Sequence, residues 1–216
     1  MLNKSIEQTL LRPDATEKDY ERLFEEARKH KFFGVCIHPA YIKQAKRALR
    51  GSGVKIVTVI GFPFGANAGG VKAYETAMAV GDGADEIDMV MNISAMKDKK
   101  YSYILDEFKK VKKACRTKPL KVIIETDLLT QDEIVEACKL CIKGKVNFVK
   151  TSTGYVKDGK GATVDNIRLI AQILEGHRPK IKASGGIRDK KTAAAMIEAG
   201  ASRIGTSAGP VIMSSK

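Results

Sequence analysis

The sequence contains no long apolar run. No window in its 216 residues approaches the roughly 18 consecutive apolar residues that a membrane-spanning helix needs. The first residues, Met1 to Glu7, also lack the apolar core of a secretory signal peptide. From these two absences we expect a cytoplasmic protein with no membrane partner.

Cysteine is also scarce. The four cysteines are too few and too scattered for a disulfide scaffold. Cys138 and Cys141 have the spacing of a redox or metal-binding pair, but they fall within a helical pattern and no second ligand pair accompanies them. We therefore expect two thiols packed on a helix, and no metal site.

Aromatic residues make up only 6% of the chain, and no motif for binding RNA or DNA is present. The net charge of +13 comes from lysines that are spread over nearly every expected helix. We interpret them as solvated helix faces that also help to attract a phosphate ligand, and expect no specific nucleic-acid partner. A dinucleotide fold has little support, because no Gly-x-Gly-x-x-Gly opens the first helix.

The sequence does contain a regular alternation of short apolar strands with amphipathic helices. The expected strands lie at Thr9–Leu11, Val35–Ile37, Lys55–Ile60, Glu86–Met91, Leu120–Glu125, around Lys150, around Lys182 and at Arg203–Gly205. Seven helices separate them, two of which begin at the capping pairs Thr16/Asp19 and Thr130/Glu133. Eight such units predict an α/β fold, a compact single-domain (β/α)₈ TIM barrel over residues 1–216. Only Pro210 to Lys216 remain for an eighth helix, so the last helix is expected to be very short or missing.

Three of the expected strands each carry a charged residue among apolar ones: Asp88, Lys150 and Lys182. An unpaired buried charge is costly, so three of them in separate strands indicate a shared interior site. All three lie near the C-terminal ends of their strands, where (β/α)₈ barrels place their active sites.

A lysine attacks carbonyl carbons only when its amine is neutral, and its unperturbed pKa of about 10.4 leaves almost none neutral at pH 7. A dry interior and a second ammonium nearby both favour the neutral form. One of the two lysines could therefore form a Schiff base while Asp88 shuttles protons. The alternative is a buried ion network that only holds the barrel together.

Small-residue loops follow the last three strands: Thr153–Gly154, Ser184–Gly186 and Gly205–Gly209. Loops at this position bind phosphate in such barrels, because glycine lets backbone N–H groups approach the anion. Each glycine turn alone is weak evidence, but three of them beside two lysines favour a phosphorylated substrate.

Taken in order, the motifs resemble the deoxyribose-phosphate aldolase family from about Ile6 to Gly209. They are Gly61-Phe62-Pro63-x-Gly65-Ala66-Asn67, Ala84 to Val90, Ile123-Ile124-Glu125-Thr126, Lys150 to Gly154, Lys182 to Arg188 and Arg203 to Ser207. The resemblance implies a class I aldolase that needs no metal or organic cofactor. Such an enzyme reversibly cleaves 2-deoxy-D-ribose 5-phosphate to D-glyceraldehyde 3-phosphate and acetaldehyde. It also implies a homo-oligomer, a dimer or a tetramer.

The same resemblance assigns roles to single residues. Lys150 matches the Schiff-base lysine, Lys182 the second lysine that perturbs it and joins the proton relay, and Asp88 the general acid/base. The positions that match phosphate contacts are Gly154, Gly185, Gly186, Gly205 and Ser207.

The chain departs from the family pattern at six positions, one of which is Gln8 in place of a histidine. Glu7 stands where aspartate is usual and lies near the substrate in the family, and Arg12 stands where lysine is common. His38 replaces asparagine, Asp127 replaces a frequent cysteine and Ala208 replaces a serine. These changes concern substrate affinity and rate more than reaction type. Two other functions stay open: a different Schiff-base enzyme of phosphosugars, such as a transaldolase-like one, and an inactive phosphate-binding barrel.

Overall fold

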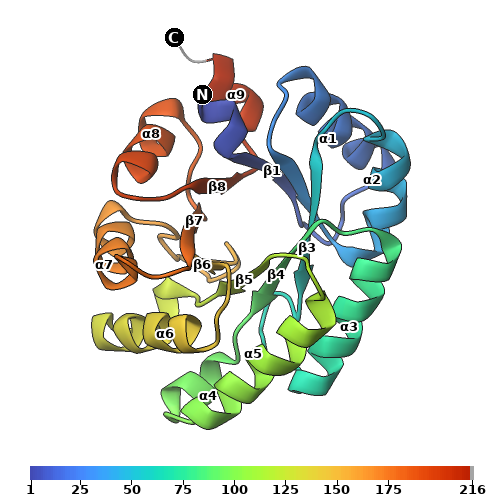
Figure 1. Ribbon diagram of the computed structural model, residues 1–216. Helices are drawn as coiled ribbons and strands as arrows, with labels where there is room; N and C mark the ends of the chain where they lie inside the picture. Colours follow the sequence, from blue (N-terminus) through green and yellow to red (C-terminus); the bar gives the residue numbers. More distant parts are fainter. Residues whose placement is uncertain (215–216) are drawn as a thin grey trace.

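A computed structural model describes residues 1–214 as a closed barrel of parallel strands inside a ring of helices (Figure 1). The strands are β1 (Ile6–Leu10), β2 (Gly34–Ile37), β3 (Lys55–Ile60), β4 (Glu86–Val90), β5 (Leu120–Ile123), β6 (Phe148–Lys150), β7 (Lys180–Ser184) and β8 (Arg203–Thr206). They follow one another in sequence order, and β8 pairs with β1 to close the barrel. The predicted (β/α)₈ barrel is confirmed.

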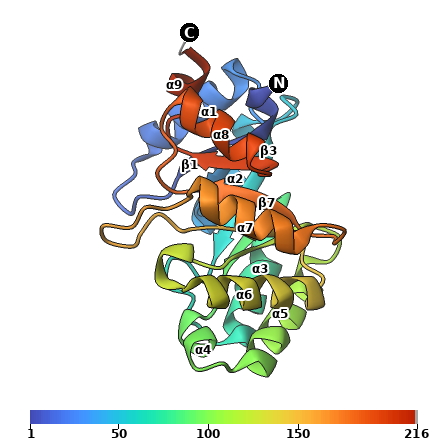
Figure 2. The same cartoon turned by 90° about the vertical axis from the view of Figure 1, so that its left-hand side faces the viewer.

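The helices lie outside the strands, as the side view makes plain (Figure 2). They are α1 (Glu17–Lys29), α2 (Ile42–Ala48), α3 (Gly69–Asp82), α4 (Ile93–Lys97), α5 (Tyr101–Cys115), α6 (Gln131–Lys143), α7 (Val164–Leu174), α8 (Lys190–Glu198) and α9 (Gly209–Ser214). The last helix is indeed short and lies beside the N-terminal segment (Figure 1). Among the helices of residues 1–214, none combines the length and the apolar character required to cross a membrane.

Local signals in the sequence set several helix ends. Both capping pairs are present as full capping boxes, in which the side chain of Thr16 or Thr130 accepts a hydrogen bond from the backbone N–H three residues on. The two thiols at Cys138 and Cys141 are free and buried on α6, as predicted.

The fourth and fifth strands end one and two residues earlier than predicted, at Val90 and Ile123, and two other elements differ more. The first strand was expected at Thr9–Leu11 but spans Ile6–Leu10, and the short helix α4 was not expected. The start of β1 reads as polar, since it contains Glu7 and Gln8, yet both side chains are buried and have partners in the barrel. Ion pairs and hydrogen bonds to residues of other elements therefore offset the cost of burying these polar side chains in a strand.

The barrel wall separates an apolar layer from a charged interior. On β4, Ile87 and Met89 belong to the large apolar cluster, whereas Glu86 and Asp88 are ion-paired with residues of other strands. This alternation follows from the period of two along a strand, which sends successive side chains to opposite faces. A small apolar group accompanies the interior charges and comprises Leu11, Cys36, Val57 and Val59, with Phe62 against it.

Candidate active site

The three charged residues that the sequence singled out lie together inside the barrel. Lys150 Nζ donates a hydrogen bond to Asp88 Oδ2 at 2.9 Å, and Lys182 Nζ donates to the same oxygen at 2.6 Å. All three side chains are buried. Strands β4, β6 and β7 thus bring two ammonium groups to one carboxylate oxygen.

A third lysine, which the sequence analysis passed over, completes the surroundings of Asp88. Lys121 on β5 is the Cα partner of Asp88 in the strand register. Its Nζ donates to Asp88 Oδ1 at 2.8 Å and pairs with Glu86 Oε2 at 2.6 Å. The signal was present in the sequence, because Lys121 is also a lysine within an apolar strand.

Glu7 and Arg203 extend this cluster toward the N-terminal end of the barrel. Glu7 is fully buried; its Oε2 accepts a hydrogen bond from Lys182 and its Oε1 pairs with Arg203 at 2.9 Å. Arg203 also reaches Glu86 at 3.4 Å, and its guanidinium lies 3.3 Å from the centre of the Phe33 ring. Lys182 therefore bridges Glu7 and Asp88, and Glu7 is connected to the expected site by this bridge.

We call these seven side chains the interior charge network. It comprises the carboxylates of Glu7, Glu86 and Asp88 and the cations of Lys121, Lys150, Lys182 and Arg203. Burial acts to raise the pKa of Asp88, but Lys121, Lys150 and Lys182 outweigh it and hold that pKa well below its usual range. The pKa of Glu7 is lowered in the same way, with Lys121 and Lys182 acting against burial. Both carboxylates are therefore ionised at neutral pH.

Two of the lysines are held in the charged form. Burial acts to lower the pKa of Lys182, yet Asp88 and Glu7 raise it above its ordinary value. The pKa of Lys121 is raised likewise, again by Asp88 and Glu7 against burial. Together with Arg203, these two ammonium groups balance the three carboxylates.

Lys150 is the cation left over in this count. With Lys150 charged the network carries one net positive charge, and with Lys150 neutral it carries none. Within residues 1–214, its one ion pair is with Asp88. Among the network residues of that range, it alone lines the cavity at the C-terminal end of the barrel.

That cavity has a volume of about 330 Å³. Besides Lys150, it is lined by all five glycine and serine positions expected to contact phosphate: Gly154, Gly185, Gly186, Gly205 and Ser207. Arg12 and Arg188 also line it, and the sequence analysis had not counted them as site residues. The Arg12 guanidinium is paired with Asp14 and Asp19, which leaves Arg188 and Lys150 as the cations available to a ligand. A cavity with these two cations and glycine-rich walls can accommodate an anionic carbonyl compound.

Glycine is required in the wall of this cavity. Gly185 and Gly186 have φ angles of 88° and 75°, in the left-handed region that other residues rarely adopt. A Cβ atom on Gly186 would also lie 2.8 Å from the carbonyl oxygen of Lys160. The tight turn after β7 therefore needs glycine at both positions.

Two carboxylates hold the loop between β6 and α7, which forms the opposite wall. Glu125, itself in the left-handed region with φ 56°, accepts a hydrogen bond from the backbone N–H of Thr153 at 3.1 Å. Asp127 accepts from the backbone N–H groups of Lys160 at 2.9 Å and Gly161 at 2.8 Å. The aspartate that replaces a frequent cysteine of the family therefore anchors this loop.

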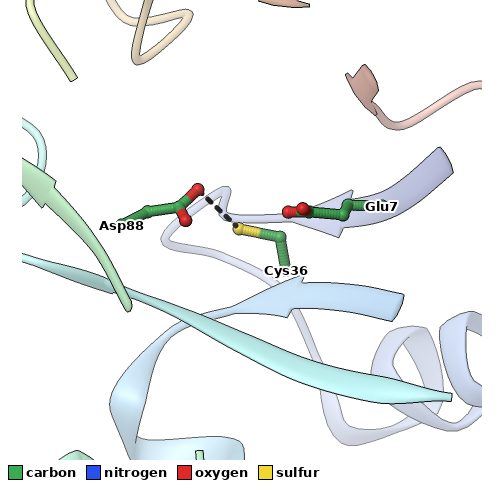
Figure 3. Close-up of side chains that lie close together, drawn as sticks. All are labelled: Glu7, Cys36 and Asp88. Carbon is green, nitrogen blue, oxygen red and sulfur yellow. Dashed lines mark hydrogen bonds between the residues drawn. The ribbon is translucent and has the colours of Figure 1, made fainter. Parts of the chain in front are cut away.

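Three of the interior side chains resemble a metal site in composition. Oxygen or sulfur atoms of Glu7, Cys36 and Asp88 lie within 4.8 Å of one another (Figure 3). However, the two carboxylates already pair with the ammonium groups of Lys182 and Lys121, and burial raises the pKa of the Cys36 thiol. A cation here would have to displace ammonium groups and ionise that thiol, so the donor set does not fit a metal.

These features define a (β/α)₈-barrel enzyme with a lysine at the floor of its cavity. The chain belongs to the DeoC/LacD aldolase family, because the model of that family matches residues 6–214.

Known proteins are similar over almost the full length. A deoxyribose-phosphate aldolase of Brevibacillus brevis is 48% identical over 212 residues, which cover 98% of this chain and 95% of that protein. One of Mannheimia succiniciproducens is 50% identical over 98% of this chain and 93% of its own length. The solved structure of a deoxyribose phosphate aldolase from Aeropyrum pernix, described as tetrameric, superposes with a TM-score of 0.91 at 30% identity. That match covers 98% of this chain and 89% of the other.

Proposed function

We propose that this protein is a class I aldolase that reversibly cleaves 2-deoxy-D-ribose 5-phosphate to D-glyceraldehyde 3-phosphate and acetaldehyde. One observation carries the proposal: among the network residues of the described range, Lys150 alone lines the cavity, so its amine can meet the carbonyl carbon of the substrate. The names of the similar proteins support the substrate.

The reaction begins when the neutral amine of Lys150 adds to the aldehyde carbon of the open-chain sugar. Loss of water gives an iminium ion, which is an electron sink. A base removes the proton of the C3 hydroxyl, the C2–C3 bond breaks, and its electrons move into the iminium group to form an enamine. D-Glyceraldehyde 3-phosphate leaves, C2 takes up a proton, and water hydrolyses the imine to release acetaldehyde and free Lys150.

Asp88 and Lys182 are the groups placed to move these protons. Asp88 Oδ2 lies 2.9 Å from Lys150 Nζ and 2.6 Å from Lys182 Nζ, so it can exchange protons with the reacting nitrogen directly or through water. Lys182 stays charged because Asp88 and Glu7 raise its pKa, so its ammonium group disfavours a second positive charge on the neighbouring Lys150.

The phosphate group of the substrate fits the far wall of the cavity. The glycine-rich turns at Gly154, Gly185, Gly186 and Gly205, together with Ser207, would supply N–H and O–H donors. Arg188 adds positive charge at the same cavity, which favours a dianionic ligand, whereas the charge of Arg12 is offset by its ion pairs with Asp14 and Asp19.

Two measurements test this function. Release of D-glyceraldehyde 3-phosphate from 2-deoxy-D-ribose 5-phosphate should be detected in a coupled assay and abolished in Lys150→Met. Borohydride reduction in the presence of acetaldehyde should add one ethyl group to Lys150, read by peptide mass spectrometry. Lys182→Met is the matched control, since it should lose rate but keep the site of trapping at Lys150. Trapping on another lysine, or turnover by Lys150→Met, would refute the mechanism.

We further propose a cytoplasmic homo-oligomer. The Aeropyrum pernix relative is described as tetrameric, and Val71, Tyr74 and Met78 form an exposed apolar stripe on α3 that is available for association. The free state of all four cysteines agrees with a reducing compartment. Light scattering after size-exclusion chromatography tests the assembly, and a purely monomeric protein would contradict it. Fractionation of cells tests the compartment.

A further inference from the structure

Lys121 lies within 4 Å of all three carboxylates of the interior charge network. Its side chain is fully buried, and its Nζ lies 2.8 Å from Asp88 Oδ1, 2.6 Å from Glu86 Oε2 and 3.6 Å from Glu7 Oε1. It does not line the cavity, as defined over residues 1–214. Lys121 therefore touches all three carboxylates of the network without access to the substrate.

We propose that Lys121 is a positioning residue whose fixed charge lets Lys150 lose its proton and whose hydrogen bond orients Asp88 toward Lys150. This inference rests on the proposed function, in which Lys150 is the nucleophile.

The first argument is the charge balance. With Lys121 present, three carboxylates face Lys121, Lys182 and Arg203, so neutral Lys150 leaves the network neutral. Without Lys121, neutral Lys150 leaves one net negative charge in a desolvated interior, where an uncompensated charge is costly. The network then keeps a proton, on Lys150 or on a carboxylate, at pH values where the native network has released it.

The second argument is the geometry of Asp88. Lys121 binds Oδ1, while Lys150 and Lys182 bind Oδ2. Because the partner on β5 occupies one oxygen, the carboxylate presents the other oxygen to the two lysines at the catalytic end. The raised pKa of Lys121, caused by Asp88 and Glu7 against burial, keeps this partner charged.

The other charged or titratable groups near Lys150 are the same in the wild-type protein and in every variant, so the loss of Lys121 still removes one positive charge. Cys36 on β2 is a buried thiol whose pKa is raised by burial, so it stays neutral. Glu125, after β5, is a further carboxylate that interacts with Lys150, and it accepts hydrogen bonds from Thr153. Arg12 and Arg188 line the same cavity as Lys150, and the Arg12 guanidinium pairs with Asp14 and Asp19. The network residues approach Lys150 from β1, β4, β5, β7 and β8.

The experiment measures the rate of borohydride trapping with acetaldehyde against pH for the wild-type protein and three variants. The acid limb is the low-pH part of this profile, where the rate rises with pH as Lys150 loses its proton. In Lys121→Met this limb should move to higher pH by about one unit, so that the rate at a given pH on the limb falls about tenfold. In Glu86→Gln the limb should move to lower pH, because this variant removes a negative charge that faces Lys121. The acid limb therefore moves in opposite directions in the variants of Lys121 and Glu86, although these two residues are an ion pair.

The control is the double variant Lys72→Met/Glu107→Gln, which disrupts a buried ion pair outside the network and should leave the limb in place. Circular dichroism establishes that each variant is folded. If Lys121→Met does not fold, the shift in Glu86→Gln still tests the proposal. A further variant, Lys121→Arg, keeps the positive charge and should show the same acid limb as the wild-type protein.

The outcomes separate the two proposals. No trapping on Lys150 in the wild-type protein overturns the proposed function. If the wild-type protein is trapped normally on Lys150, two results overturn only the role of Lys121. Either the acid limbs of Lys121→Met and Glu86→Gln coincide with the wild-type limb, or both limbs move in the same direction. A lower trapping rate in Lys121→Met with an unmoved limb would make Lys121 merely structural and also contradict the inference.

Discussion

At the scale of single residues, three buried lysines of similar sequence context have different surroundings. Lys121 and Lys182 each pair with two or more carboxylates, whereas Lys150 pairs with Asp88 and lines the cavity. Between Lys150 and Lys121 the difference lies in position along the strand, since Lys150 ends β6 while Lys121 lies within β5. Lys182 is the Cα partner of Lys150 and differs from it in its second carboxylate partner, Glu7. A lysine at the end of a barrel strand can both reach substrate and be desolvated enough to act as a nucleophile.

The turn after β7 supplies a prediction about phosphate binding. Gly186→Ala would place a Cβ atom 2.8 Å from the carbonyl oxygen of Lys160 and would strain a backbone with φ 75°. We expect KM for 2-deoxy-D-ribose 5-phosphate to rise about tenfold or more, with a much smaller effect on trapping with acetaldehyde, which has no phosphate. Steady-state kinetics and borohydride trapping of the same variant measure the two effects.

Gly176→Ala is the matched control for this variant. Gly176 has φ 73°, and nothing lies within 4 Å of the Cβ position, so its replacement introduces the same backbone strain away from the cavity. The strain costs about 1 kcal/mol of stability in either variant. Equal KM values for the two variants would show that Gly186 has no part in binding phosphate.

At the scale of secondary-structure elements, a buried ion pair joins α3 and α5 to the catalytic end of the barrel. Lys72 on α3 pairs with Glu107 on α5 at 2.6 Å, and both side chains are fully buried. Lys72 Nζ also donates to the carbonyl oxygens of Gly65 at 2.7 Å and Val90 at 2.8 Å. One ammonium group therefore connects two helices, the loop after β3 and the end of β4.

Removal of one partner from this pair should be more harmful than removal of both. Lys72→Met leaves the Glu107 carboxylate buried without its cation, and we expect a loss of about 3–5 kcal/mol in the free energy of unfolding. Lys72→Met/Glu107→Gln should lose less than the sum of the single variants, because no buried charge is left unpaired. Urea unfolding followed by circular dichroism measures all three values. Strict additivity would contradict the coupling.

At the scale of the whole molecule, the interior charge network links stability to pH. Asp88 and Glu7 have ordinary pKa values of 3.8 and 4.5, and the folded barrel lowers both. As pH falls through these ordinary values, the unfolded chain binds protons that the folded protein does not, so the folded state loses stability. This stability is present above about pH 5 and decreases as the pH falls below that value.

We therefore expect the melting temperature to fall steeply between pH 5 and pH 3, with each of the two groups contributing about 1.4 kcal/mol per pH unit where only the unfolded state is protonated. Because the charges lie in one closed barrel, melting should remain a single transition. Differential scanning calorimetry across this range measures both features. Asp88→Asn should show a shallower dependence, and an equal slope in that variant would contradict the assignment.

Much of this protein could be predicted from its sequence. The alternation of apolar strands and amphipathic helices predicted the (β/α)₈ barrel, since burial of a parallel sheet imposes that pattern on every unit. Charges at Asp88, Lys150 and Lys182 marked the interior because such residues are rare in apolar strands. The same reasoning passed over Lys121 and misplaced β1, where Glu7 and Gln8 made a buried strand look polar.

The tertiary structure decided how the charges are paired. Closure of β8 onto β1 places Arg203 beside Glu7, and the register between β4 and β5 places Lys121 beside Asp88. These partners are up to 196 residues apart in the chain, so no local pattern predicts them. From the residues alone, the sequence marks two lysines in apolar strands as candidates. Only the closed barrel determines which ammonium groups balance the carboxylates and leaves Lys150 as the surplus cation at the cavity.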